Sequence, residues 1–487
     1  MNRWKSFSVL ATALLTFAVA AVGCGKDESG TTAKPSDPAG AAGQKEVYPE
    51  NGLPKNEKVT LKFGFWENGY GREWIDNAIQ SFTKKYPNVK FDVTYSPKIN
   101  TVISTKVAAN NDDDMFDIIS PSFTGGDNEK TSLILAGKFE PLDDLWEREL
   151  PDAPGKKLKD MLIDGAYKNQ RRFDNKTYDL PMGGYATGLF FDKAFFEKNG
   201  WNQNPQTWDE FVKLLDDIKA KGIVPLTFPG IYATYLDYGF ALKRFELAEI
   251  NGTLDKALSD YKNQKLPNYM APENVEAYKR LAELGKKGFF PQGVSALTHT
   301  QSQMQILQHK AAMVFTGDWV QNEMKDSVPD GFKWGFMVIP FGTKPEQTKW
   351  IQNGTGSGGM MIWKNKPELN KKWAKEFNLW LFTNDVQAFN NKNAGILPIR
   401  KDFADDPKRL EQMQDAPRSV LEYTKKNKTR FETLQKDVVL DPHPAHAQVA
   451  KIYKEQLPDV ALGNKDPVAF LEELEKLFKE GLDAQKK

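Results

Sequence analysis

The sequence predicts an α/β protein with two domains. At 487 residues the chain is longer than a single hydrophobic core usually spans. Residues 59–95 show strand, helix and strand patterns in succession, and a second α/β series follows Pro181. Hydrophobic residues make up 40% of the chain and charged residues 27%, the balance of a soluble globular protein.

The first α/β unit lies between residues 59 and 119. Apolar residues alternate over 59–65, recur at helical spacing over 74–86, and alternate again over 89–95. A strand, a helix and a second strand within about 35 residues predict a parallel pair of strands joined by a crossover helix. We expect a further helix around 101–109 and a buried strand end at 117–119.

The second series has equally local signals. Residues 188–191 predict a strand, and 224–226 predict a short one. Thr207 and Glu210 have the spacing of a capping box, which predicts a helix that ends near Gly222. No internal repeat of 20 to 50 residues is visible, which argues against a solenoid.

Charge and cysteine content exclude several classes of protein. The net charge of +1 gives no electrostatic reason to expect a nucleic acid partner. Cys24 is the single cysteine, so the chain forms no intramolecular disulfide and no cysteine-based zinc site.

The N-terminus predicts export and a lipid anchor. Residues 1–23 combine two early positive charges with an apolar run at 9–22, which suits a signal peptide and is short for a membrane span. The run ends at Cys24 and is similar to the lipobox of bacterial lipoproteins, although Ala21 stands where Leu is usual. We expect acylated Cys24 to anchor the chain; the alternative is an ordinary signal peptide with an incidental cysteine.

Residues 24–58 predict a flexible linker between anchor and body. They are rich in Gly, Ser, Thr, Pro, Asp and Lys, and their large apolar residues are Val47, Tyr48 and Leu53.

Five segments, taken in order, resemble the family 1 extracellular solute-binding proteins, which include receptors for maltodextrins and other oligosaccharides. The segments are VTLKFGFW at 59–66, YDLP at 178–181 with GLFFDK at 188–193, PQTWDEF at 205–211, LQHKAAMVFTGDW at 307–319 and GILP at 395–398. The run 301–325 is similar to receptors for N-acetylglucosamine and diacetylchitobiose.

The resemblance implies a type II periplasmic-binding-protein fold, with a ligand cleft between two α/β lobes. The N-terminal lobe is expected at 45–181 and 343–402, and the C-terminal lobe at 182–342 and 403–487. It further implies a monomer without a cofactor that captures a sugar at the extracytoplasmic face of the cell membrane. Such a protein is no enzyme, and it delivers the sugar to the permease subunits of an ABC importer.

A sugar cleft needs aromatic rings for the apolar faces of a pyranose and polar groups for its hydroxyls. We expect such residues at strand ends and in loops that match the family's cleft. The candidates are Trp66, Glu67, Asn68, Ser120, Ser122, Tyr185, Tyr235, Asp318, Trp319, Asn353, Gly354 and His443. Trp319 is the leading candidate, because the family stacks sugars on this ring; the alternative for Trp66 and Trp319 is a structural role in the core.

Two other functions stay open. A surface glycosidase would need two carboxylates across a cleft, and no spacing among the 65 acidic residues singles out a pair. A sensor subunit would close in the same way but present its ligand to a membrane kinase.

Metal binding is not expected. His443 and His446 lie close together, but the chain has only four histidines and no HExxH motif. We interpret the acidic run 112–114 as a solvated loop, with a calcium site as the alternative. The glycine-rich loop 353–359 lacks the ending of a phosphate-binding P-loop.

Overall fold

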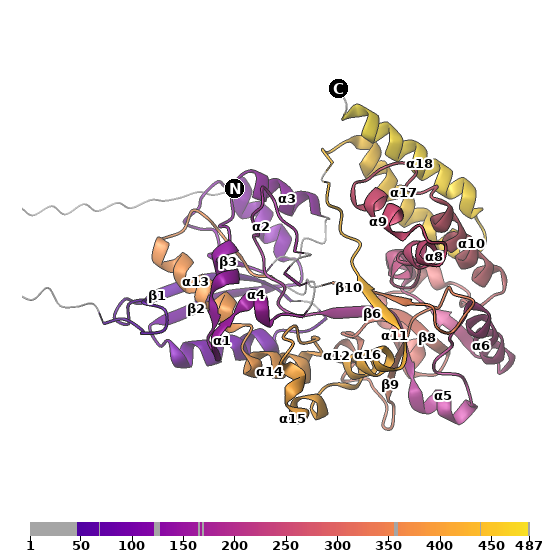
Figure 1. Cartoon of the computed structure of the whole chain (residues 1–487), viewed down its shortest axis with the longest axis horizontal. Coiled ribbons are helices and arrows are strands. Elements are labelled where there is room, and N and C mark those ends of the chain that lie inside the picture. The colour runs from indigo at the N-terminus through magenta and orange to yellow at the C-terminus, as the bar shows by residue number, and fades with distance from the viewer. Residues whose placement is uncertain are drawn as a thin grey trace, which may run out of the picture. The chain divides into compact units, whose positions relative to one another are not determined.

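A computed structural model describes residues 46–485, apart from 68, 121–126, 164–165, 168–169, 355–358 and 439 (Figure 1). For residues 127–129, 354 and 404 it describes the backbone only. The predicted signal peptide, Cys24, Asn68 and Ser122 lie outside the described residues.

The first sheet has four strands in the order β11–β3–β1–β2. β1 (Val59–Trp66) and β2 (Val89–Ser96) pair in parallel and are joined by α1 (Glu73–Lys85), which confirms the predicted unit. β3 (Ile118–Ile119) is parallel to β1. β11 (Met361–Ile362) runs antiparallel to β3, so a distant part of the chain completes this sheet.

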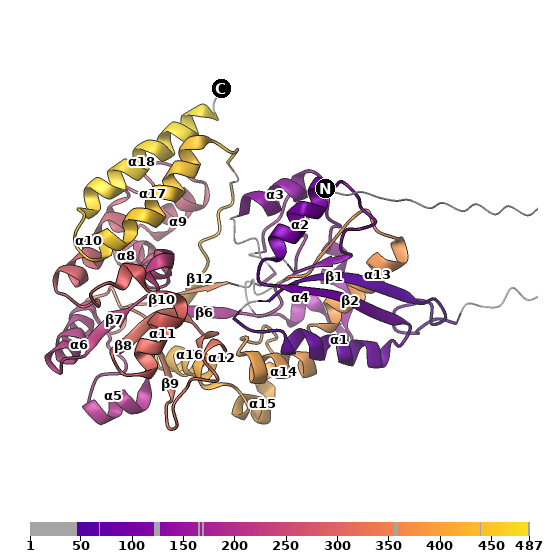
Figure 2. The same ribbon diagram turned by 180° about the vertical axis from the view of Figure 1, so that it is seen from behind.

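Helices and a small two-stranded sheet surround the first sheet (Figures 1 and 2). These elements are α2 (Ile99–Ala108), α3 (Asp127–Leu135), η1 (Asp143–Glu147), β4 (Glu149–Leu150), β5 (Ala153–Lys157), α4 (Leu158–Met161), α13 (Glu368–Trp380), α14 (Asn384–Ala394), η4 (Phe403–Asp405) and α15 (Pro407–Glu411). The core beneath them is strongly aromatic: the ring centroids of Phe82 and Phe377 lie 5.3 Å apart.

The second sheet has six strands, five of them in the order β12–β10–β6–β8–β7, with β9 also paired to β6. They are β6 (Tyr185–Asp192), β7 (Val224–Thr227), β8 (Ala311–Gly317), β9 (Trp334–Met337), β10 (Lys349–Gly354) and β12 (Thr429–Glu432). β7 and β8 are parallel, and β6 runs antiparallel to β8, β9 and β10.

Helices surround this second sheet, and those at the C-terminus pack on other helices of the group (Figure 2). They are α5 (Lys193–Asn199), α6 (Trp208–Ala220), η2 (Gly230–Leu236), α7 (Asp237–Phe240), α8 (Lys243–Ile250), α9 (Leu254–Lys262), α10 (Pro272–Lys286), η3 (Val294–Ala296), α11 (His299–Leu307), α12 (Val320–Glu323), α16 (Asp415–Lys426), α17 (Pro444–Ala461) and α18 (Pro467–Ala484). None of the helices in the described part of the chain is both long enough and apolar enough to cross a membrane.

The start of α6 confirms most of the predicted capping box. The Thr207 hydroxyl accepts a hydrogen bond from the Glu210 backbone N–H at 3.3 Å. The Glu210 carboxylate, however, accepts from the backbone N–H of Gln206 at 2.7 Å, one residue before the expected donor. The two side chains therefore still accept hydrogen bonds from backbone N–H groups at the start of the helix, but Glu210 accepts from Gln206 instead of Thr207.

Residues 46–58 differ from the flexible linker that their composition predicts. Leu53 is buried, and the Tyr48 hydroxyl donates to Asn88 Oδ1 at 2.8 Å. The Tyr48 ring meets the rings of Tyr86 and Trp373 edge-on at 4.8 and 5.7 Å. These few apolar side chains suffice because the folded body supplies the surface on which they pack.

The two sheets have separate hydrophobic cores, one drawn from residues 53–399 and one from residues 186–478. β10 lies within 343–402, a stretch that we expect in the N-terminal lobe, yet it pairs with β6 and β12 of the second sheet. The lobe boundaries stay a prediction.

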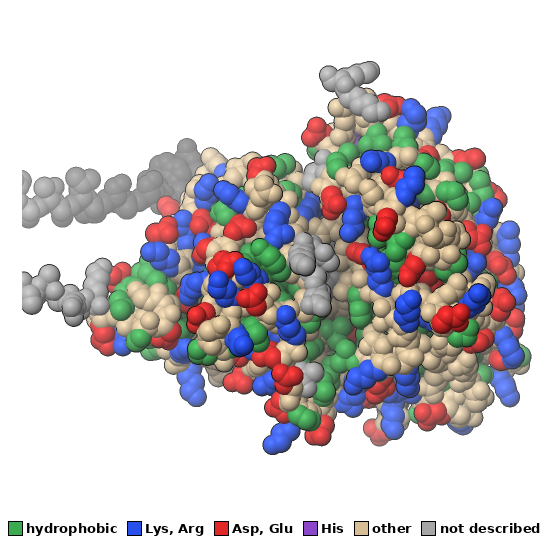
Figure 3. Space-filling model, in the orientation of Figure 1, with side chains coloured by type: hydrophobic (Ala, Val, Ile, Leu, Met, Phe, Trp, Pro, Cys, Tyr) green, Lys and Arg blue, Asp and Glu red, His purple; other side chains and the backbone are tan. Residues whose placement is uncertain are grey.

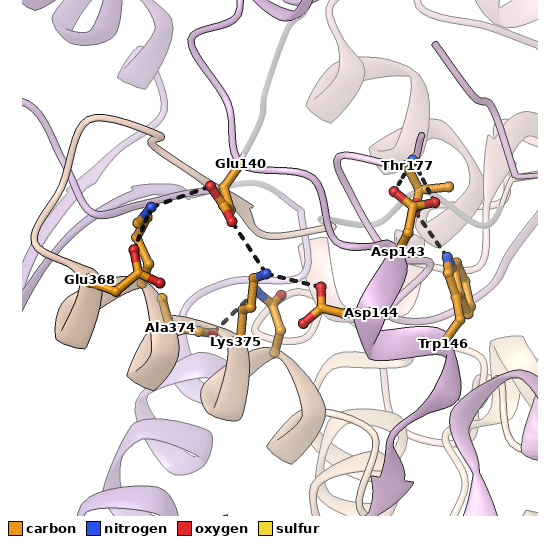
Figure 4. Close-up of polar contacts among 10 residues, drawn as sticks. Glu140, Asp143, Asp144, Trp146, Thr177, Glu368, Ala374 and Lys375 are labelled. Atoms are coloured by element: carbon orange, nitrogen blue, oxygen red, sulfur yellow. Dashed lines mark hydrogen bonds and ion pairs between the residues drawn. The ribbon is translucent and has the colours of Figure 1, made fainter. Parts of the chain in front are cut away.

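An ion pair between Asp144 and Lys375 joins η1 to α13, and Asp143 of the same short helix contacts Thr177 (Figure 4). Lys375 Nζ lies 2.9 Å from Asp144 Oδ1. The Asp143 carboxylate accepts from the backbone N–H of Thr177 at 3.1 Å, and Trp146 Nε1 donates to Thr177 Oγ1 at 2.9 Å. Thr177 is fully buried, so it joins two turns inside the core.

Replacing Thr177 with valine should lower the free energy of unfolding by about 1–3 kcal/mol, because the indole N–H of buried Trp146 loses its acceptor. Urea denaturation measures this loss. Thr60→Val, at an exposed position of β1, is the control and should change stability by less than about 0.5 kcal/mol. Equal losses in the two variants would contradict the assigned role of Thr177.

Candidate functional site

Four aromatic side chains from separate segments meet at one place, and we call them the aromatic cluster. Trp319, just after β8, has its ring centroid 6.2 Å from Tyr70, 5.8 Å from Tyr185 and 5.9 Å from Tyr238, each edge-on. Tyr70 follows the first sheet's β1, Tyr185 begins β6, and Tyr238 lies in α7. The cluster thus joins the end of one sheet to the other.

The position of the Trp319 ring depends on a glycine. A Cβ atom at Gly317 would lie 2.1 Å from the indole, so a side chain there would displace the ring. The Gly-x-Trp motif at 317–319 therefore lets the indole lie directly against the backbone of β8.

Asp318 is fully buried between the two sheets. Its Oδ1 accepts from the Tyr70 hydroxyl at 3.1 Å, and its Oδ2 accepts from the backbone N–H of Ala186 at 3.1 Å. Burial raises the pKa of the carboxyl group to about 8, because removal from water disfavours the charged form, while the hydrogen bonds oppose this shift. Asp318 therefore acts as a hydrogen-bonding centre beneath the aromatic cluster.

A row of tyrosines extends the cluster along η2 and α7. Tyr232, Tyr235 and Tyr238 follow one another at intervals of three residues, from a kink at Tyr232 in η2 into the α-helix α7. The rings of Tyr235 and Tyr238 lie 4.7 Å apart. The ring of exposed Tyr232 stacks on His299, the first residue of α11, at 4.3 Å. Burial lowers the pKa of His299, so neutral imidazole is favoured.

Polar groups border the same region. Gln303 Nε2 donates to Glu323 Oε2 at 2.6 Å, and Asn322 Nδ2 donates to the carbonyl oxygen of Gly69 at 2.8 Å. Lys325 Nζ lies 3.3 Å from Glu73 Oε1. Carboxylate, amide and tyrosine hydroxyl groups offer both donors and acceptors to a polar ligand.

The structure brings Tyr185, Asp318 and Trp319 together, with Tyr235 adjoining them through Tyr238. Asn353 lies half-buried on β10 and is paired with Ala186, and backbone of Gly354 pairs with Tyr185. These six predicted site residues therefore lie around the start of β6.

Other predicted residues lie elsewhere. Trp66 is half-buried at the end of β1, where it packs with the core around Phe116 and not with the aromatic cluster. Glu67 follows it, and its backbone N–H donates to Ser96 at 3.2 Å. Ser120 is buried after β3, and its backbone N–H donates to Gly64 at 2.8 Å. His443 caps α17 and lines a separate cavity.

Sequence analysis missed Tyr70, Tyr238, His299, Gln303 and Glu323. The three-residue spacing of Tyr232, Tyr235 and Tyr238 is a signal that could have found Tyr238. The others show no local pattern, because they become neighbours only through packing of distant segments.

The surface carries a groove with hydrophobic side chains along its walls (Figure 3).

No cluster of three or more metal-ligating side chains occurs among the residues described. In the acidic run, Asp112 Oδ1 accepts from Trp363 Nε1 at 2.7 Å, and Asp114 Oδ2 lies 2.6 Å from Lys106 Nζ.

The fold is that of a two-lobed α/β binding protein. The solved structure of a chitin oligosaccharide binding protein aligns with a TM-score of 0.63 at 20% identity, over 87% of this chain and 99% of that one. This agreement confirms the predicted fold class.

Residues 68–388 match the family of bacterial extracellular solute-binding proteins, and the chain belongs to that family. Membership confirms the resemblance drawn from the sequence and the extracytoplasmic location that it implies. Family members are binding proteins.

Two relatives illustrate the range. The diacetylchitobiose binding protein NgcE of Streptomyces coelicolor is 26% identical over 301 residues, 62% of this chain and 60% of that protein. The chain thus matches only about 60% of this relative's length. The uncharacterized ABC transporter extracellular-binding protein PH1214 of Pyrococcus horikoshii is 21% identical over 507 residues, 99% of this chain and 92% of that protein.

Replacing Asp318 with asparagine should flatten the dependence of stability on pH. Between pH 4 and 8 the folded protein keeps a proton on Asp318 that the unfolded chain has lost, so stability falls as pH rises. This group contributes a slope of up to about 1.4 kcal/mol per pH unit, which the variant lacks. Melting temperatures from pH 5 to 9 measure the effect. Exposed Asp326→Asn is the control, and a slope unchanged in Asp318→Asn would refute the assignment.

Proposed function

We propose that this protein is an extracytoplasmic receptor that captures a carbohydrate between its lobes and delivers it to an ABC importer. The observation that carries the proposal is the aromatic cluster, bordered by polar side chains, at the meeting point of the two sheets. Aromatic rings suit the C–H faces of a pyranose, and the bordering groups suit its hydroxyls. The names of the two relatives support a sugar ligand and an ABC transporter.

We infer that the preferred sugars contain N-acetylglucosamine. The relative from Streptomyces is named for diacetylchitobiose, and a structural neighbour is named for chitin oligosaccharides. An N-acetyl group has an apolar methyl and a polar amide, so it needs an aromatic contact beside a hydrogen-bonding one. Tyr235, His299 and Gln303 supply both kinds of group on η2 and α11.

The proposed capture step is closure of the lobes over the sugar. Tyr70 and Gly69 follow the first sheet, whereas Asp318 and Asn322 follow β8 of the second. Hydrogen bonds between these two segments stabilise a closed arrangement, and the bound sugar adds contacts to it. The closed monomer then docks on the permease subunits. In support, the Pyrococcus relative is named as an ABC transporter extracellular-binding protein.

The proposal includes a lipid anchor. Signal peptide 1–23 is removed, and acylated Cys24 holds the body near the membrane surface. We propose no catalytic role for this protein. The buried carboxyl group of Asp318 accepts hydrogen bonds from Tyr70 and Ala186, and this suits a structural acceptor better than a proton donor to a ligand.

Replacing Trp319 with alanine should weaken sugar binding by about 2 kcal/mol, roughly thirtyfold in Kd, because the ring at the centre of the cluster is lost. Calorimetry of residues 46–487 with N-acetylglucosamine, chitobiose, maltose, cellobiose and xylobiose measures it. Trp319→Phe should recover part of the affinity.

The matched control is Trp380→Ala, which removes a half-buried tryptophan from α13, a helix beside the first sheet. It should lower stability and leave the sugar affinity unchanged. Absence of binding by every sugar in the unmodified protein would refute the receptor proposal, and detection of sugar hydrolysis would replace it with a glycosidase.

A further inference from the structure

A cavity of about 640 Å³ lies next to the aromatic cluster. Thr234 and Asp237 line it, while their neighbours Tyr235 and Tyr238 face His299 and Trp319. No member of the aromatic cluster lines this cavity. The short helical segment 230–240 therefore separates the two sites and contributes side chains to both.

The cavity contains two cationic side chains without acidic partners. Arg244 is 8% exposed, and its guanidinium donates to the side-chain and backbone oxygens of Asn268, at 3.2 and 2.9 Å, and lies over the ring of Tyr261 at 5.1 Å. Lys436 Nζ donates to the backbone carbonyl oxygen of Tyr261 at 3.2 Å. Among the described residues, no carboxylate lies within ion-pairing distance of either cation.

Other buried cations of this protein do have such partners. Lys243 Nζ lies 2.7 Å from Glu246 Oε2, and the Arg400 guanidinium lies 2.7 Å from Asp152 Oδ1. Burying a charge costs free energy unless an opposite charge and hydrogen bonds compensate it. Because Arg244 and Lys436 have no carboxylate partner, the lining of this cavity could bind an anion.

The acidic group inside this cavity is already engaged. Asp237 accepts a hydrogen bond from the Tyr453 hydroxyl, which in turn lies 2.5 Å from the Tyr278 hydroxyl. Burial raises the pKa of Asp237 to about 7. Asp441, at the rim, is exposed to solvent.

The pKa of Lys436 also reflects the absence of a neighbouring carboxylate. Burial, together with the positive charge of Arg244, lowers the pKa of Lys436 to about 6. An anion that enters the cavity would stabilise the ammonium form and favour uptake of a proton. Arg171 also lines the cavity and adds a cation from the part of the chain around the first sheet.

We propose that this cavity binds an oxyanion carried by a carbohydrate, a carboxylate or sulfate group, so that the receptor prefers acidic sugars. The inference rests on the proposed function, because a sugar chain bound at the aromatic cluster would extend past the segment 230–240 and place its charged group against Arg244 and Lys436.

Binding of the acidic sugar should strengthen as pH falls from 8 to 6. Over this range Lys436 gains a positive charge and Asp237 loses a negative one. Protonation of His446 acts in the same direction, although burial lowers its pKa, and the guanidinium of Arg244 stays charged. The side chains of His443 and Arg171 also line the cavity. Burial raises the pKa values of Tyr261, Tyr269, Tyr278 and Tyr453, which therefore stay neutral.

The test compares acidic and neutral sugars by calorimetry on residues 46–487 at constant ionic strength. The pairs are glucuronate with glucose, and N-acetylglucosamine 6-sulfate with N-acetylglucosamine; sodium sulfate alone is a third arm. We expect at least one acidic sugar to bind tenfold more tightly than its neutral partner at pH 6, with a smaller preference at pH 8. Lys436→Met should abolish this preference, whereas Lys425→Met, at an exposed position on α16, should retain it.

The outcomes separate this inference from the receptor proposal. Neutral sugars that bind as tightly as acidic ones would overturn the acidic preference and leave the receptor proposal intact. Free sulfate that binds as tightly as the sulfated sugar would overturn the sugar-borne source and assign the cavity to an inorganic anion. Failure of every sugar would refute the receptor proposal, and failure of sulfate as well would overturn the anion site itself.

Discussion

The buried carboxyl group of Asp318 is the interaction on which this site depends. It accepts hydrogen bonds from the Tyr70 hydroxyl and the Ala186 backbone, and so ties the end of β1 to the start of β6. Its neighbours Gly317 and Trp319 place an indole directly over the strand. Because the carboxyl group is neutral below a pKa of about 8, it can occupy this dry position without a counterion. Loss of these bonds would separate the two halves of the aromatic cluster.

Two kinds of chemistry lie on either side of the segment 230–240. On one side Tyr235 and Tyr238 join an aromatic and polar surface, suited to neutral sugar rings. On the other side Arg244 and Lys436 line a cavity that lacks a matching carboxylate. The segment 230–240, made of η2 and α7, thus contributes side chains to both places. Such an arrangement would distinguish ligands by shape and by charge at once.

Local patterns predicted local structure well, and distant pairing poorly. The unit β1–α1–β2 and the Thr207 cap were found because their signals lie within a few turns of chain. Composition predicted a flexible linker at residues 46–58, and this was wrong because Tyr48 and Leu53 are stabilised by the folded body on which they pack. Neither β11 on the first sheet nor β10 on the second follows from a local pattern, because a strand's partner depends on the whole topology.

The sequence by itself determined the α/β class and the family, and it predicted three residues that the structure brings together. Tyr185, Asp318 and Trp319 were predicted because their segments resemble the parts of the family that form the ligand cleft. Only the tertiary structure decided that Tyr70 and Tyr238 join them, that Trp66 packs elsewhere, and that Arg244 and Lys436 lack acidic partners. The physical reason is that periodicity reports which face of an element is buried, whereas neighbours and charge balance depend on which distant segments pack together.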